Sequence, residues 1–140
     1  MKLVIIGCGR VGSQLAAEMD RSGHEVVVVD RDPVAFSRAS SRGVLTKEFR
    51  GDQVVGNGTD VDVLKRSGIE RADGFVAVTE GDNRNIMAAQ IAKHVFKVPH
   101  VVVRIYDPER AEAYAKLGLH TLCPTIEGAK HIEHMLKESQ

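Results

Sequence analysis

The chain has 140 residues and is 43% apolar, which is typical of one globular domain with a single core. Nineteen basic side chains balance nineteen acidic ones, so no net charge favours nucleic acid or an anionic membrane surface. No apolar run approaches the roughly 20 residues of a membrane helix, which argues against direct membrane insertion. A predicted strand begins at once, leaving no room for a signal peptide, and the two cysteines form no disulfide framework; we expect a cytoplasmic protein with free thiols.

The first thirty residues have the pattern of a dinucleotide-binding unit. An apolar run over 2–6 predicts a strand, a glycine turn follows it, and a helical pattern covers 13–21. A second apolar run, 25–29, ends at Asp30, eighteen residues after the last glycine of the turn. Strand, glycine turn, helix, strand and acid in this order predict a phosphate-binding site. Its expected ligand residues in the turn are Gly7, Cys8, Gly9, Arg10, Val11 and Gly12.

Each residue type in this unit has a physical reason. We expect Gly7 to allow the sharp turn, Gly9 to let a pyrophosphate approach the main chain, and Gly12 to let the helix pack closely on the strands. The N-terminus of the helix would face the phosphates, and Asp30 would accept hydrogen bonds from a ribose. We expect Cys8 to be a small residue that fits within the glycine turn rather than a redox group. A glycine turn that binds no nucleotide is the alternative.

A second helix is predicted to begin after Asp32, a suitable N-cap, with Pro33 at the first helical position and an end near Gly43. Arg31 directly follows the predicted ribose acid. Its guanidinium could lie over an adenine ring or meet a phosphate, or could simply be solvated. The irregular segment 44–53 is predicted to be a surface excursion.

A short strand over 53–56 is followed by a loop that offers small polar groups and room for a base. In an open parallel sheet, ligands bind beyond the carboxyl ends of the strands. Asp60 is predicted to cap the next helix, 61–67. The expected contacts in the loop are Asn57, Gly58 and Thr59.

The apolar run 75–78 predicts a fourth strand, whose carboxyl end should face the glycine turn. Thr79 could reach a ribose or a phosphate. Asp82 is expected mainly to cap a long helix that ends near Phe96, and Asn85 lies one turn into that helix. All three are candidate cofactor-binding residues.

The last third of the chain predicts a strand over 100–104, a helix from 108 to about 117, a strand over 119–123 and a final helix to about 138. Arg104 ends an apolar strand, where a charge is costly unless it is paired, so we expect it to face an anionic ligand or neighbouring acids. Strands and helices alternate along the whole chain, which predicts an α/β, Rossmann-like, doubly wound parallel sheet of six strands in the order 3-2-1-4-5-6.

The residues indicate binding rather than catalysis. A dehydrogenase needs a substrate pocket and an acid or base near the nicotinamide, and no such set is evident. We therefore predict a module that binds a nucleotide and has no catalytic residues and no metal site. A small NAD-dependent oxidoreductase, or a fragment of one, is the alternative function. A bare assembly scaffold that binds no ligand is a third.

At this point the residues resemble a known family, the nucleotide-binding half of RCK domains, also called the N-terminal TrkA or KTN domain of bacterial Trk and Ktr potassium-uptake systems. The resemblance spans nearly the whole chain in family order. The matching segments are 7–12, 29–30, 56–60, 64–73, 76–79 with Asp82 and Asn85, 103–105 with Asp107 and Pro108, and 122–124.

The resemblance implies a cytoplasmic regulatory subunit, peripheral to the cell membrane, that gates a potassium transporter or channel. Members bind NAD(H), ATP or ADP and pair into homodimers, which build rings. For this chain NAD(H) is preferred over ATP, ADP or AMP. Gly7 to Gly12 would hold phosphates and Asp30 the ribose, Asn57 would lie by the base, and Arg10 would reach terminal phosphates across the dimer. The last helix would cross to the partner subunit.

The sequence departs from the family in two places. Thr125 stands where members that bind ATP with a cation often have an acid, and Asn57 stands where many have an acid. These departures argue against a cation-assisted triphosphate site and weaken any inference about ligand choice. We expect 1–140 to form one N-terminal nucleotide-binding domain, without the C-terminal RCK subdomain usual in the family.

Overall fold

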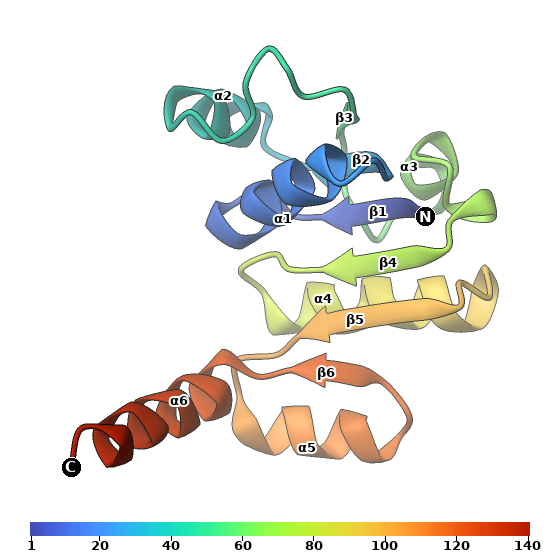
Figure 1. The fold of residues 1–140 in the computed structure, drawn as a ribbon. Helices are drawn as coiled ribbons and strands as arrows, with labels where there is room; N and C mark the ends of the chain where they lie inside the picture. The colour runs from blue at the N-terminus through green and yellow to red at the C-terminus, as the bar shows by residue number, and fades with distance from the viewer.

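The computed structural model describes residues 1–140 and has one six-stranded parallel sheet flanked by helices (Figure 1). The strand order is β3-β2-β1-β4-β5-β6, and every neighbouring pair is parallel. This confirms the predicted Rossmann-like fold. The strands are β1 (Lys2–Ile6), β2 (Glu25–Asp30), β3 (Asp52–Val55), β4 (Gly74–Ala77), β5 (His100–Arg104) and β6 (His120–Leu122).

The central strands are apolar on both faces because helices cover both sides of the sheet. One face of β1 presents Leu3 and Ile5 to α1 (Arg10–Arg21) and α2 (Pro33–Ser41). The other face contributes to a larger core with residues of α3 (Val61–Arg66), the 3₁₀ turn η1 (Ile69–Arg71), α4 (Asp82–Gln90) and α5 (Pro108–Lys116). Such two-sided burial is the reason for the unbroken Val and Ile runs of β1 and β2.

Aspartates begin three of the helices as N-caps, and two of them, Asp32 and Asp60, are those that the sequence predicts. The carboxylates of Asp32, Asp60 and Asp107 each accept a hydrogen bond from the main-chain N–H two residues later. The predicted cap by Asp82 is wrong. Gly81 is the N-cap of α4, and Asp82 is the first helical residue.

Two further segments differ from expectation. The helix predicted to run to Phe96 is α-helical only to Gln90 and continues as a π-helical turn, η2 (Ile91–Val95). The segment 44–53 is not only a surface excursion, since Leu45 is buried and packs with α2 in the smaller core.

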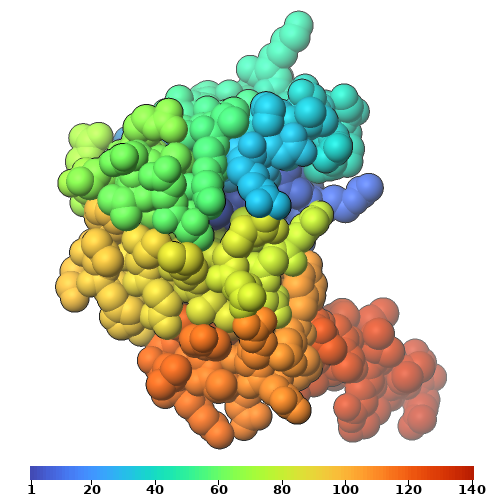
Figure 2. Space-filling model, turned by 180° about the vertical axis from the view of Figure 1, so that it is seen from behind, coloured from blue at the N-terminus to red at the C-terminus, as the bar shows by residue number.

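The last helix, α6 (Pro124–Glu138), begins just after β6 and extends away from the sheet (Figures 1 and 2). None of its residues is buried. The apolar side chains of Ile132, Met135 and Leu136 are each more than half exposed. No helix of the chain is both long enough and apolar enough to cross a membrane.

Candidate functional site

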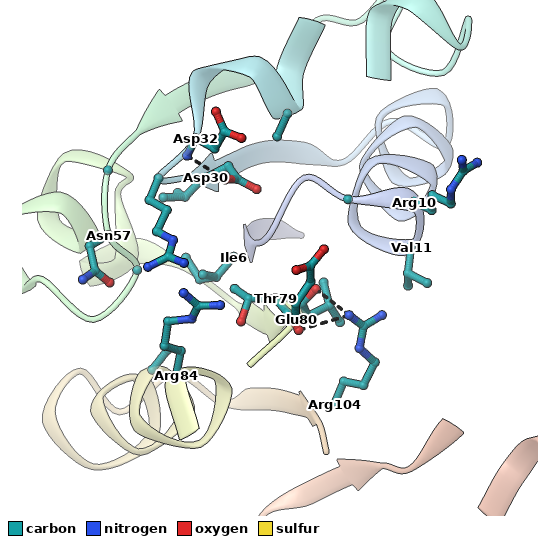
Figure 3. A pocket seen from close by; sticks show the side chains of 18 of the residues that line it. Ile6, Arg10, Val11, Asp30, Asp32, Asn57, Thr79, Glu80, Arg84 and Arg104 are labelled. Carbon is teal, nitrogen blue, oxygen red and sulfur yellow. Dashed lines mark hydrogen bonds between the residues drawn. The ribbon is translucent and has the colours of Figure 1, made fainter. Parts of the chain in front are cut away.

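A cleft of about 590 Å³ opens at the carboxyl ends of the central strands (Figure 3). Ten of the fifteen predicted site residues line it, drawn from the turns that follow β1, β2, β3 and β4 and from the end of β5. The structure therefore brings together segments that are far apart in the sequence. The ten are Gly9, Arg10, Val11, Asp30, Arg31, Asn57, Gly58, Thr59, Thr79 and Arg104.

The glycines of the first turn have three different environments. A Cβ atom on Gly12 would lie 1.8 Å from the carbonyl oxygen of Gly7, so helix α1 can approach the turn only because Gly12 has no side chain. Gly7 has φ of +108°, a conformation that favours glycine. A Cβ atom on Gly9 would meet no atom within 4 Å, so its main chain is open to the cleft. Gly7 and Gly12 shape the turn without lining the cleft.

The N-terminus of α1 is open to a ligand. Gly9 is the N-cap and provides no side-chain hydrogen bond to the first turn. The first N–H groups of a helix have no partner within the helix, and they carry its positive dipole end. Gly9, Arg10 and Val11 line the cleft at this point, so the main chain can bind an anion there.

Asp30 connects the first turn to the second. One carboxylate oxygen accepts a 2.8 Å hydrogen bond from the N–H of Cys8, and the other accepts one of 2.8 Å from the N–H of Asp32. Each oxygen keeps a further lone pair, so the half-buried carboxylate can still accept a hydrogen bond from a ribose hydroxyl.

The Cys8 side chain lies in the smaller core and does not line the cleft. Burial, and then the negative charge of Asp30, raise the pKa of Cys8 from 9.0 to about 11, and Arg42 lowers it in part. The thiol therefore stays protonated at neutral pH, which argues against a reactive thiolate.

The loop after β3 lies against the end of β1. A Cβ atom on Gly58 would lie 2.3 Å from Cγ2 of Ile6, so only glycine allows this approach. The side-chain oxygen of Asn57 accepts hydrogen bonds from the N–H and hydroxyl of Thr59, at 2.9 and 2.8 Å. The amide oxygen is thus used within the loop, and the amide nitrogen is the group that Asn57 can offer to a base.

Asn85 and Asp82 support the cleft but do not line it. Asn85 is fully buried; its side-chain oxygen accepts a 2.6 Å hydrogen bond from the hydroxyl of Thr79, and its amide donates to the carbonyls of Thr79 and Arg104. The Asp82 carboxylate accepts hydrogen bonds from the N–H groups of Tyr106 and Asp107. Both residues therefore position the loops that follow β4 and β5.

Arg104 lines the cleft, as predicted, but its partners are not acids. One terminal nitrogen donates to the carbonyl oxygens of Val78 and Thr79, at 3.0 and 3.1 Å (Figure 3). The guanidinium carbon lies 4.8 Å from the centre of the Tyr106 ring. The cation is 7% exposed, and its Nε atom is buried without a hydrogen-bond partner.

Sequence reasoning missed three arginines that also line the cleft: Arg38, Arg42 and Arg84. Arg38 lies in the last turn of α2 and Arg42, four residues later, is its C-cap, a spacing that is visible in the sequence and can place both on one side of the helix. Arg84 extends from the first turn of α4 toward the strand ends (Figure 3). Six arginines and three acids, Asp30, Asp32 and Glu80, line the cleft, so it is positively charged although the chain is neutral.

Comparisons with known proteins identify relatives of this chain. The family model of the TrkA-N domain matches residues 3–124. A Trk system potassium uptake protein TrkA of Streptomyces coelicolor is 50% identical over 122 residues, covering 87% of this chain and 52% of that protein. The chain spans about half the length of such curated relatives.

Two solved structures have the same fold. The GsuK RCK domain has a TM-score of 0.77 and 25% identity, over 99% of this chain and 28% of that one. The Kef C-terminal domain of Shewanella denitrificans, solved in an AMP-bound form, has a TM-score of 0.79 and 17% identity, over 100% and 83%. The expectation of a binding domain rather than an enzyme agrees with these names, which refer to potassium uptake and to an RCK domain. The resemblance predicted from the residues is thus confirmed, and the chain belongs to the TrkA-N domain family.

Proposed function

We propose that this chain is a nucleotide-binding regulatory domain of a potassium-uptake system. The observation that carries the proposal is the convergence on one cleft of an open helix N-terminus at Gly9, the carboxylate of Asp30 at the end of β2 and an excess of arginines. Glycine-cradled helix N-termini bind phosphates, and an acid at the end of the second strand binds a ribose.

The residues that line the cleft could serve both halves of a dinucleotide. In one half, Asn57 and Arg31 would flank the base and Asp30 would bind its ribose, while Gly9 and Arg10 would bind phosphate. The other half of the cleft, which Thr79 and Arg84 line, would bind the second nucleotide of the dinucleotide. NAD(H) uses both halves, whereas ADP, ATP or AMP uses one. The Asp30 carboxylate would repel a 2′-phosphate, so an unphosphorylated ribose is preferred.

The partners we propose follow from two observations. Curated relatives are named for Trk potassium uptake, so a membrane potassium transporter or channel is the proposed target. Helix α6 exposes apolar side chains that a second copy of the chain could cover, so we assign it a role in a homodimer, from which a ring could be built. In this role 1–140 acts as one N-terminal nucleotide-binding domain at the inner face of the membrane.

The proposal is tested by the melting temperature of the purified chain with NADH, NAD⁺, ADP, ATP and AMP. A ligand that binds only the folded state raises the melting temperature in proportion to the logarithm of its concentration. At least one of the five is expected to do so, and Gly9→Val, which fills the cradle, should lose the response. Stabilisation by none of them would exclude the proposed function.

A further inference from the structure

Tyr106 lies where the cleft, α4 and α6 meet. Its side chain lines the cleft. Its N–H donates a 2.9 Å hydrogen bond to Asp82 in the first turn of α4, and its carbonyl oxygen accepts one of 3.0 Å from the hydroxyl of Thr125 in the first turn of α6. The thiol of Cys123, the N-cap residue of α6, also donates to this carbonyl, at 3.5 Å. A shift of Tyr106 would therefore displace its hydrogen-bond partners at the start of α6.

The orientation of α6 depends on few contacts. No residue of the helix is buried, and Ile126 in its first turn is the one apolar side chain of α6 that packs partly against the larger core. The hydrogen bond from Thr125 to Tyr106 is the side-chain link from this helix to the loop after β5. Removing it would leave α6 held by Ile126, by the hydrogen bond of the Cys123 thiol to the same carbonyl and by its covalent connection to β6.

Arg104 provides the reason why a ligand would move Tyr106. Its guanidinium stacks on the Tyr106 ring, and its Nε atom is buried without an acceptor. A buried donor without a partner is unfavourable, so an arrangement that gives Nε an acceptor is favoured over this one. A phosphate oxygen in the cleft can be that acceptor once the guanidinium and the ring shift relative to each other and uncover Nε.

The two arrangements of Arg104 and Tyr106 differ in whether Nε of Arg104 can reach an anion, so an anionic ligand could change the balance between them. A ligand moves a conformational equilibrium only if it interacts differently with the two states. Here the anion would interact with Arg104 in one arrangement and be excluded from Nε in the other. We infer that Tyr106 and Thr125 are positioning residues that couple occupancy of the cleft by an anionic nucleotide to the orientation of α6. The inference rests on the proposed nucleotide-binding function.

The experiment is amide hydrogen exchange over residues 127–130 of the full chain, with and without ADP or NADH, alongside melting temperatures with the same probes. Three variants are compared with the unmodified chain. Thr125→Val removes the hydroxyl at nearly constant shape, Thr125→Ser keeps it and is the matched control, and Tyr106→Leu removes the ring but keeps the main-chain hydrogen bonds.

If nucleotide binding and the orientation of α6 are coupled as strongly as is typical of allosteric sites, nucleotide changes the exchange rate at 127–130 by at least about fivefold in the unmodified chain and in Thr125→Ser. In Thr125→Val the nucleotide still raises the melting temperature. In Thr125→Val and Tyr106→Leu, each at a nucleotide concentration that saturates it, the exchange rate changes less than about twofold. A merely structural role would alter exchange equally with and without nucleotide. If Thr125→Val perturbs α6 without nucleotide, Tyr106→Leu gives the decisive comparison.

Two failures can be told apart. If a nucleotide raises the melting temperature but exchange at 127–130 does not respond, or responds equally in Thr125→Val and Tyr106→Leu, the coupling is overturned and the proposed function stands. If neither nucleotide raises the melting temperature, the proposed function fails and the coupling fails with it.

Discussion

The main-chain amide of Cys8 donates a 2.8 Å hydrogen bond to the carboxylate of Asp30 and thereby fastens the glycine turn to the end of β2. The other oxygen of the same carboxylate holds the N–H of Asp32, where α2 begins. Asp30 thus fixes the geometry of the glycine turn, and in the proposed function it would also present acceptors to a ribose. The two roles make separate predictions for stability and for binding.

Asp30→Ala should lower the free energy of unfolding by about 1–3 kcal/mol, because two N–H groups lose their acceptor. Asp30→Asn keeps one acceptor oxygen and should cost less. Urea unfolding measures both, with Asp52→Ala on the exposed start of β3 as the control. An Asp30→Ala chain as stable as this control would show that the two hydrogen bonds contribute nothing net.

The glycines of the turn should separate folding from binding. Gly12→Ala should destabilise the chain by about 3 kcal/mol or more, because the methyl group would overlap the Gly7 carbonyl. Gly9→Ala should cost no more than about 1 kcal/mol, since φ is −78° and no atom lies within 4 Å, yet its methyl group enters the cleft. Denaturant unfolding and nucleotide-dependent melting check the pair. Equal losses of stability in the two variants would contradict the environments described for them.

Stability should fall at alkaline pH through Cys8. Burial raises the pKa of this thiol in the folded chain to about 11, above its value of 9.0 in the unfolded chain. Folding therefore favours the neutral thiol; the contribution is fully present below pH 9 and is lost as pH rises toward 11, on the order of 2 kcal/mol in all.

The measurement compares unfolding of the unmodified chain and Cys8→Ala between pH 8 and about 11. Other groups titrate in this range, so the informative quantity is the difference in slope. The unmodified chain should lose stability more steeply than Cys8→Ala. Parallel curves would show that Cys8 ionises equally in the folded and unfolded chains.

The apolar side of α6 should drive self-association. Ile132→Asp should shift a dimer to a monomer without loss of melting temperature in the monomer, because Ile132 is 59% exposed and contributes to no core. Lys130→Asp, on the polar side of the same helix, is the matched control. Sedimentation equilibrium measures the mass, and a monomer at all concentrations in the unmodified chain would exclude the homodimer.

Much of the fold could be predicted because its signals are local. The β-branched runs, the glycine turn after β1 and the Asp N-caps each reflect physics within a few residues. Asp82 shows the limit of such reasoning. A local pattern does not distinguish an N-cap from the first helical residue, and the carboxylate of Asp82 instead binds N–H groups more than twenty residues away, at Tyr106 and Asp107.

Site residues that belong to a sequence motif could be predicted. Site residues that reach the cleft through the packing of helices could not. Ten predicted residues line the cleft because the carboxyl ends of parallel strands share one edge. The contributions of Arg38, Arg42 and Arg84 depend on how helices α2 and α4 are oriented against the sheet, which no motif describes. The carbonyl partners of Arg104 likewise depend on the path of the loop after β4.

The edges of the sheet have a consequence for how copies of this chain can meet. The outer strands, β3 and β6, have only four and three residues, so each edge offers a very short row of free main-chain groups. Short edge strands are a common protection against pairing of sheets from different molecules. The homodimer proposed for this chain would therefore form through side-chain surfaces such as that of α6, whose contacts can tighten or loosen without the risk of aggregation through the backbone.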